Sequence, residues 1–273
     1  MMVNQIQKIE IRNLWGKYNY KWVLDPDVNI LTGLNGSGKT TVLQIIDAVL
    51  ASQPKRLKEF GVEGKIKGTG FTFNFNKDKP IVGWEKRNYA NISTFDIPLR
   101  DRKSFKKGET YLDNELDALI YQRRPGVYTF TDFRLKATTS PEKAEEINKR
   151  IRFLFDIIDT MFDRTDKKIS IDLQTNTLQI FRDQESLEFS HLSSGEKQML
   201  IILFKVFLME EQPTIMLMDE PENSLHIDWQ QQLIDVIRKL NPNCQLIIST
   251  HSPSIFGEGW GDKLFFLEDI LLD

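Results

Sequence analysis

The stretch "GLNGSGKTT", residues 33 to 41, decides the fold, because its residue types fit a loop that cradles phosphate. Gly33, Gly38, Lys39 and Thr40 match the spacing G-x-x-x-x-G-K-[ST]. In such a loop the glycines let backbone N–H groups converge on phosphate oxygens, and the helix that follows adds positive potential. The lysine neutralises the outer phosphates, and the threonine hydroxyl ligates Mg²⁺. The residues expected to contact ATP are Asn35, Gly36, Ser37, Gly38, Lys39, Thr40 and Thr41.

The segments around this loop have the order that a phosphate-binding loop requires. Residues 5–14 alternate apolar and polar side chains like a half-buried strand, and residues 20–24 and 28–33 supply two more extended pieces. Residues 41–51 are then apolar at helical spacing. The loop therefore joins a strand to a helix.

The C-terminal third alternates strands with helices in the same way. An apolar helix over 196–210 precedes the strand "TIMLMDE" (214–220), the helix 226–240 and the strand "CQLIISTH" (244–251). This alternation predicts a mostly parallel sheet.

The middle of the chain predicts further elements with weaker patterns. Those we expect are strands over 68–76 and 80–87, a helix from Thr110, a buried strand over 125–134, a helix from Pro141 and a hairpin over 167–183.

Composition excludes several classes of protein. The 273 residues include 36 basic and 39 acidic ones, so no overall basic charge indicates nucleic acid. The longest apolar stretch, Met199 to Met209, is interrupted by Lys205 and falls short of the ~20 residues that a membrane span needs. A single cysteine, Cys244, and no secretory signal at the N-terminus predict a cytoplasmic protein.

Two polar sites at strand ends complete the expected nucleotide chemistry. Asp219 can hold the shell of Mg²⁺, and the adjacent Glu220 can orient and deprotonate an attacking water. His251 ends another buried strand, where its imidazole can hydrogen-bond the γ-phosphate or the attacking water. Glu220 and His251 are the catalytic candidates, and Thr40 and Asp219 are the metal candidates.

A second glycine-containing turn, "HLSSGEKQML" at residues 191 to 200, precedes the apolar helix. It resembles the signature motif of the ABC-type ATPases, which begins Leu-Ser-x-Gly. Ser193 and Gly195 match its serine and second glycine, whereas Ser194 replaces the usual first glycine. The resemblance implies that Ser193, Ser194, Gly195 and Glu196 of one subunit cap the ATP held by another copy. A homodimer is then the minimum assembly, with larger assemblies left open.

Within that family the chain is most similar to the RecF/SMC-like and OLD-type (overcoming-lysogenisation-defect) branch. The resemblance rests on residues 8–46, on "LSSGEKQ", and on residues 218–234 followed by 247–256, which together cover about half the chain. It implies that Asn223, Ser224 and His226 form the D-loop, which touches the opposite subunit. The family's Q-loop glutamine has no clear match, because Gln122 corresponds only by rough position. The long coiled coil of SMC proteins and the C-terminal nuclease domain of OLD proteins have no counterpart, so the output is expected from a separate protein.

The expected fold is α/β, an ABC-type P-loop nucleotide-binding domain. It combines a RecA-like, mostly parallel sheet with an antiparallel β lobe and a helical signature lobe. We expect one domain over residues 1–273. Its parts are the N-terminal β and P-loop region (1–51), an insertion and strand end (52–140), the helical and signature lobe (141–212), and the strand with Asp219, the D-loop and His251 (213–273).

The motifs and the resemblance together predict an ATPase that forms ADP and phosphate and dimerises when ATP is bound. By resemblance it controls a separate effector, a nuclease or toxin, in a prokaryotic anti-phage defence module. The alternative is a DNA-binding repair or end-sensing ATPase of SMC/RecF type. Its support is the basic run "RDRKSFKKGE" (100–109) with Arg123 and Arg124. A transporter's motor subunit is the third candidate, and the signature and D-loop residues favour the other branch over it.

Overall fold

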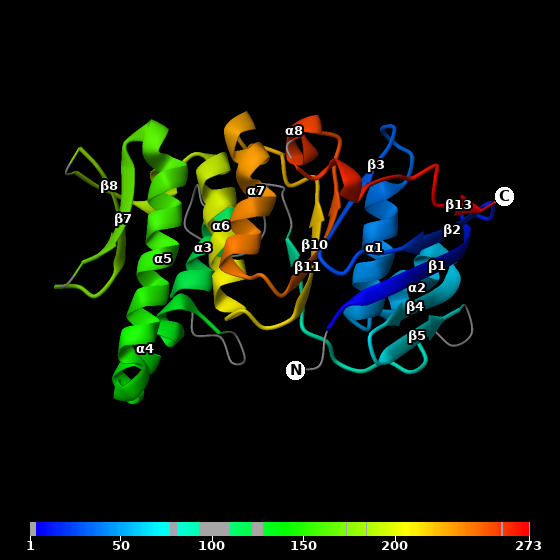
Figure 1. The fold of residues 1–273 in the computed structure, drawn as a ribbon, viewed down its shortest axis with the longest axis horizontal. Coiled ribbons are helices and arrows are strands. Elements are labelled where there is room, and N and C mark those ends of the chain that lie inside the picture. The colour runs from blue at the N-terminus through cyan, green and yellow to red at the C-terminus, as the bar shows by residue number, and fades with distance from the viewer. Residues whose placement is uncertain are drawn as a thin grey trace. The chain divides into compact units, whose positions relative to one another are not determined.

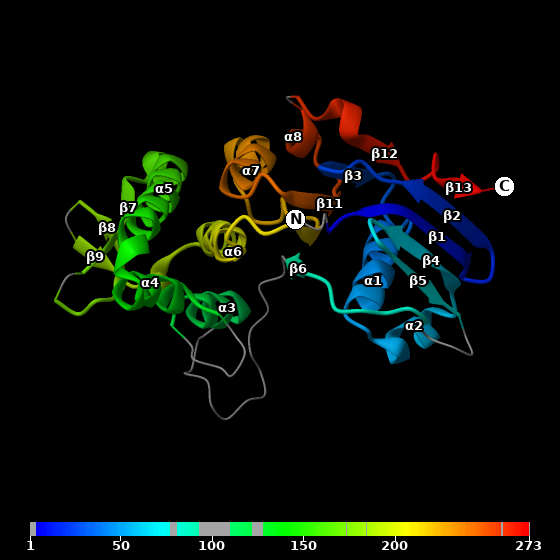
Figure 2. The same ribbon diagram turned by 60° about the horizontal axis from the view of Figure 1, so that its bottom comes forward.

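The computed structural model describes residues 4–76, 81–92, 110–121, 128–172, 174–183, 185–257 and 259–272. Contacts divide the chain into two compact units. The first comprises the described parts of Met1–Thr94, Gln212–Glu222 and Asn243–Asp273, and the second those of Phe95–Glu211 and Asn223–Pro242. Figures 1 and 2 show their elements from two directions. The basic run 100–109 and Gln122, Arg123 and Arg124 lie outside the described residues.

The first unit contains a parallel sheet that carries the phosphate loop. Its order is β12-β3-β11-β10-β6, and its neighbouring strands all run parallel. The strands are β3 (Val28–Thr32), β6 (Tyr89–Ile92), β10 (Thr214–Asp219), β11 (Cys244–Ser249) and β12 (Leu264–Phe266). Every residue of β3 and β11 is buried, as expected for the centre of a covered parallel sheet.

The register of this sheet brings three strand ends together. Ser249, the last residue of β11, is level with Asp219 on β10 and with Leu31 on β3. The phosphate loop follows β3 directly and leads into α1 (Lys39–Leu50). Ligands of open parallel sheets bind outside the carboxyl ends of the strands, and the candidate residues lie at that edge.

An antiparallel sheet covers the other side of the first unit's core. Its order is β13-β2-β1-β4-β5, formed by β1 (Ile6–Leu14), β2 (Tyr18–Val23), β4 (Glu63–Gly68), β5 (Phe71–Phe75) and β13 (Leu271–Leu272). Buried side chains from both sheets and from α1 form one cluster that includes Ile9, Trp22, Ile46, Phe73 and Ile215. Two short helices, α2 (Pro54–Phe60) and α8 (Pro253–Phe256), complete this unit.

The second unit is built around one largely buried helix, α6 (Ser194–Leu208). Its elements are α3 (Tyr111–Ile120), α4 (Phe130–Thr139), α5 (Ala144–Phe162), α6, α7 (Ile227–Leu240) and an antiparallel sheet of β7 (Lys167–Ile171), β8 (Leu178–Arg182) and β9 (Glu185–Leu187). Helix α6 contacts each of the other four helices, and both views show it between α5 and α7. Aromatic rings join it to α4, with Phe133 and Phe207 centroids 4.7 Å apart.

Two expected strands are wrong. Residues 128–134 form no strand, because Thr129 caps helix α4: its side chain accepts a hydrogen bond from Asp132 N, and the Asp132 carboxylate accepts one from Thr129 N. Over 81–87 the only pairing in the described chain is an isolated bridge between Val82 and Asn74. The strand of this region is β6, four residues that we did not predict, and it pairs with β10 at the edge of the parallel sheet.

The remaining expected elements are confirmed. Helix α3 begins after Thr110, a short 3₁₀ turn at Pro141 leads into α5, and α6 spans most of 196–210. The hairpin over 167–183 pairs Lys167 with Arg182. Among the described residues, no helix is long and apolar enough to cross a bilayer.

Candidate active site

The phosphate loop has a backbone that requires glycine. Gly33, Gly36 and Gly38 have φ values of 146°, 77° and 116°, in the region that side-chain-bearing residues avoid. Gly38 caps the N-terminus of α1, and a Cβ atom on it would lie 2.8 Å from a ring carbon of Trp15. The glycine at position 38 is therefore required both by its backbone angle and by the indole that covers it.

Lys39 is folded back onto its own loop. The residue is 3% exposed, and its Nζ donates hydrogen bonds to the carbonyl oxygens of Gly33 and Leu34, at 3.0 Å each. Burial lowers the pKa of Lys39, and nearby carboxylates, those of Glu220 and Glu268 first among them, oppose this shift. The ammonium is thus held at the centre of the loop by neutral carbonyl groups.

Three oxygen-bearing side chains meet at the strand ends. The Thr40 hydroxyl donates to Asp219 Oδ1 at 3.1 Å, and the Ser249 hydroxyl donates to the same oxygen. The structure therefore brings together the two predicted metal candidates, Thr40 and Asp219, and adds Ser249 from the neighbouring strand.

The two predicted catalytic residues are in direct contact. His251 Nε2 lies 3.2 Å from Glu220 Oε1, and both side chains remain about one-third exposed. Glu220 has a φ of 48°, an uncommon backbone angle for this residue type, and its N–H donates to Ser249 O at 2.9 Å. The strained turn directs the carboxylate toward the residues that follow β11.

The predicted signature residues form the start of α6 in the second unit. Ser193 is the N-cap: its Oγ accepts from Glu196 N at 3.3 Å, and its own N–H donates to Glu196 Oε2 at 2.9 Å. This reciprocal pair is a capping box, which satisfies two backbone donors at the helix start. Ser194 and Gly195 form the first turn of the same helix.

Glu196 is held by a cation from the neighbouring sheet. Its side chain is 3% exposed, and Lys167 Nζ lies 2.6 Å from Glu196 Oε1. Burial acts to raise the pKa of Glu196, but the bonds from Lys167 and Ser193 outweigh it, so the pKa is lowered.

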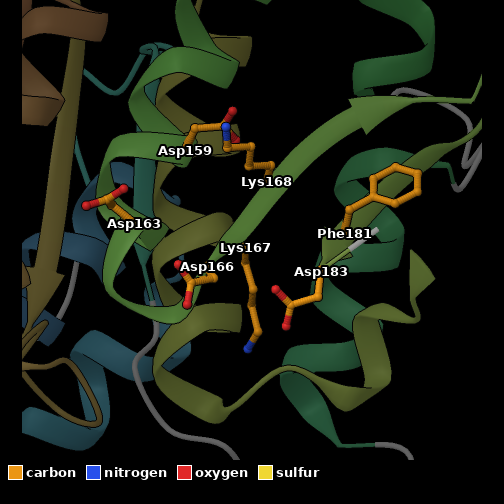
Figure 3. A pocket seen from close by; sticks show the side chains of 7 residues that line it. All are labelled: Asp159, Asp163, Asp166, Lys167, Lys168, Phe181 and Asp183. Carbon is orange, nitrogen blue, oxygen red and sulfur yellow. The ribbon is translucent and has the colours of Figure 1, made fainter. Parts of the chain in front are cut away.

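Lys167 also lines a cavity of about 550 Å³ beside the end of α5. Figure 3 shows the side chains that line this cavity, with Lys167 extending away from Lys168 and Asp159.

The predicted D-loop lies against the signature turn within the second unit. A Cβ atom on Gly195 would lie 2.2 Å from the carbonyl oxygen of Ser224, whose φ is 68°. His226 caps α7, and its Nδ1 accepts from Asp228 N at 3.3 Å. Asn223 precedes this turn in the chain. The predicted site residues therefore form two sets, one in each compact unit.

A model of one known protein family matches most of the chain. The model of the family described as "AAA domain, putative AbiEii toxin, Type IV TA system" matches residues 28–104 and 96–257, which include both sets. The chain belongs to this AAA-domain family.

Curated relatives of this family member cover most of the chain at low identity. The Septu protein PtuA of Bacillus thuringiensis is 22% identical over 91% of this chain and 72% of its own length. A probable metal transport system ATP-binding protein of Chlamydia muridarum is 25% identical over 81% of this chain and 67% of its own length. The retron Ec83 probable ATPase of Escherichia coli is 29% identical over 68% of this chain and 36% of its own length.

Solved structures identify the fold of the family member. An SMC head, crystallised with the C-terminal winged-helix domain of ScpA, covers 93% of this chain with a TM-score of 0.60 and 14% identity, and the match spans 91% of the SMC chain. The ABC-type fold predicted from the sequence is confirmed. With the family match and the ATP-binding relatives, the chain is an ATPase of ABC/SMC type.

The phosphate loop fits the triphosphate that this family implies. Ser37 Oγ is buried and has no hydrogen-bond partner among the described residues, a situation that costs free energy. A phosphate oxygen would accept a hydrogen bond from this hydroxyl, and the start of α1 supplies backbone N–H groups beside it.

Three residues of the site were missed at the sequence level. Glu222 lies two positions after Glu220, and Ser249 lies two positions before His251. Their closeness to the two strand ends was the sequence feature that could have identified them. Trp15 lies on a turn between β1 and β2, and no motif spacing places its ring over Gly38.

Proposed function

We propose that this ATPase is an ATP-driven dimerising switch that controls a separate effector, a nuclease or toxin, in a prokaryotic anti-phage defence module. The observation that carries the proposal is the division of the candidate residues. Lys39, Glu220 and His251 lie in the first unit, whereas Ser193 and Gly195 lie in the second. By resemblance to ABC-type ATPases, the second set of one subunit completes the nucleotide site of another.

In the proposed hydrolysis, each side chain of the first set has one task. Lys39 exchanges its two loop carbonyls for oxygens of the outer phosphates. Glu220 orients a water molecule and accepts its proton, while His251, 3.2 Å away, hydrogen-bonds an oxygen of the γ-phosphate.

The metal is proposed at Thr40 and Asp219, whose oxygens are the ligand type that Mg²⁺ prefers. Within the described ranges, no group of three or more His, Cys, Asp or Glu residues could hold a metal ion. A Mg²⁺ site of the usual nucleotide type needs fewer protein ligands than that, because phosphate and water supply the rest. When bound, Mg²⁺ would neutralise part of the charge on the phosphate oxygens.

The second set is proposed to act in trans. Ser193 and the backbone of Gly195 would cap the γ-phosphate of the opposite subunit, and Asn223, Ser224 and His226 would touch that subunit beside it. A two-fold dimer buries two equivalent nucleotides by this arrangement. Hydrolysis would remove the bridging phosphate and release the subunits, which is the change that an effector can sense.

The names of the family and of two relatives support a defence setting. The family description includes a putative toxin and a toxin–antitoxin system, and the relatives include a Septu protein and a retron ATPase. The transport relative supports ATP binding alone.

Sedimentation of the Glu220→Gln variant tests the proposal. This substitution keeps a side chain of similar size but removes the base, so ATP should remain bound and trap the dimer. We expect a dimer with ATP and a monomer without it, and Lys39→Ala, as the control, should stay monomeric in both conditions. A Glu220→Gln protein that stays monomeric at saturating ATP would contradict the proposal.

DNA binding is the second candidate, favoured by one face of the antiparallel sheet. Basic side chains alternate there with buried ones on β1, β2 and β4, and they are Lys8, Arg12, Lys21, Lys65 and Lys67. The acidic residues on the same strands are Glu10 and Glu63. ATPase rates with and without duplex DNA over a salt series separate the candidates, because phosphate contacts weaken steeply with salt. No stimulation and no binding at low salt would remove this candidate.

A further inference from the structure

Glu222 connects the segment after strand β10 to the loop that follows strand β11. It follows Glu220 by two positions, and its carboxylate faces residues 250–252, which come directly after β11. Glu222 Oε1 accepts hydrogen bonds from Thr250 Oγ1 at 2.6 Å, from His251 N at 2.9 Å and from Ser252 N at 3.2 Å. All of these groups belong to the first unit.

These bonds fix the backbone that carries His251. Two successive N–H groups and one hydroxyl converge on a single oxygen, so the loop turns around the carboxylate. The Thr250 hydroxyl also accepts from Ser252 N at 2.9 Å, which closes the turn on itself. With its backbone held in this way, the His251 imidazole reaches Glu220 Oε1 at 3.2 Å.

The strands below this loop do not depend on Glu222. Thr250 N donates to Leu31 O at 3.1 Å, and Glu220 N donates to Ser249 O at 2.9 Å, both through the backbone. Loss of the carboxylate would therefore leave the sheet paired. It would release only the short loop that follows β11, where the His251 N–H would have to find another acceptor.

We propose that Glu222 is the positioning residue for His251, acting through the backbone of residues 250–252. The inference rests on the roles proposed above for Glu220 and His251, and it adds the group that keeps them in contact. Glu222 itself is not placed on the nucleotide: it acts on turnover because a catalytic group displaced by about 1 Å can cost on the order of 10²-fold in rate.

The steady-state rates of ATP hydrolysis of the variants in a double-mutant cycle test this inference. The variants are Glu222→Ala, His251→Ala and the double variant, with Glu59→Ala, an exposed carboxylate of α2, as the matched control. We expect Glu222→Ala to lower kcat by about 10- to 100-fold with KM nearly unchanged. The double variant should be no slower than His251→Ala alone, because both changes remove the same contribution.

The Glu222→Gln variant distinguishes positioning from a general loss of structure. Its amide oxygen can still accept the three bonds, so its kcat should stay close to wild type while that of Glu222→Ala falls. Equal losses in the Gln and Ala variants would overturn the inference, and so would additive effects of Glu222→Ala and His251→Ala.

The proposed function can fail separately. A His251→Ala protein with wild-type turnover would overturn the role of His251 and the inference with it. A slow His251→Ala beside an unaffected Glu222→Ala would overturn the inference alone. The dimerising switch is tested separately by sedimentation of the Glu220→Gln variant. That result does not depend on the rates of the Glu222 and His251 variants.

Discussion

The carbonyl oxygen of Ser224 lies against Gly195 so closely that a Cβ atom on the glycine would be 2.2 Å from it. Real Cβ atoms do not approach backbone that closely, so one of the two segments would have to shift. The first turn of α6 and the residues before α7 are thereby fixed to each other within the second unit.

Gly195→Ala is therefore expected to destabilise the protein by about 1 to 3 kcal/mol, the usual cost of overpacking a tight contact. The measurement is urea unfolding of the nucleotide-free protein. Gly261→Ala is the matched control, because a Cβ atom there meets nothing within 4 Å. Equal stability of the two variants would show that the Gly195 contact relaxes without cost.

Lys167→Met should leave Glu196 buried without its cation. Breaking a buried ion pair by removing one partner costs about 3 kcal/mol, because the remaining charge is uncompensated. Lys167→Arg should keep most of the wild-type stability, since it keeps a positive charge beside Glu196 Oε1. Urea unfolding of the three proteins at neutral pH gives the comparison.

The same pair predicts how this difference depends on pH. The folded-state pKa of Glu196 is lowered, so its contribution to stability is present above the ordinary value of 4.5 and is lost as pH falls through the folded pKa. The gap in free energy of unfolding between wild type and Lys167→Met should therefore be largest near neutral pH and shrink on acidification. A gap that stays constant down to acidic pH would exclude Glu196 as its source.

Gly38→Ala should abolish ATP binding without unfolding the protein. Alanine is strained at a φ of 116°, and its methyl group would meet the Trp15 ring at 2.8 Å, so the loop must deform where it would hold phosphate. Titration with a labelled ATP analogue measures the loss. Gly61→Ala, at a φ of 65° with open space around it, is expected to bind ATP like wild type.

The structure of residues 28–51 and 214–251 could be predicted from the sequence. In these segments the local sequence pattern indicates the same element that the folded protein forms. The strands β3, β10 and β11 are mostly apolar and end in polar residues, and the loop after β3 has a fixed spacing. The capping residues of α4 show why other parts failed. Thr129 and Asp132 form a start signal for a helix, but the aromatic residues between and after them resemble a buried strand.

Other features depend on contacts that no local pattern records. Strand β6 has only four residues, "YANI", and its position is set by parallel pairing with β10 more than 120 residues later. Lys167 lies in a hairpin recognised by its alternation, yet its bond to Glu196 depends on how that hairpin packs on the start of α6. The carboxylate of Glu222 is likewise assigned only by the donors that face it.

Complementation between two inactive variants tests most directly whether each ATP site is shared by two subunits. Lys39→Ala removes the phosphate-binding lysine and Ser193→Arg blocks the capping turn, so each protein alone should hydrolyse little ATP. In a mixed dimer, one site combines an intact loop with an intact turn. An equal mixture should then regain up to about a quarter of the wild-type rate, since half of the random two-fold dimers are mixed and each has one complete site. A mixture whose rate equals the average of the two separate proteins would contradict the shared site.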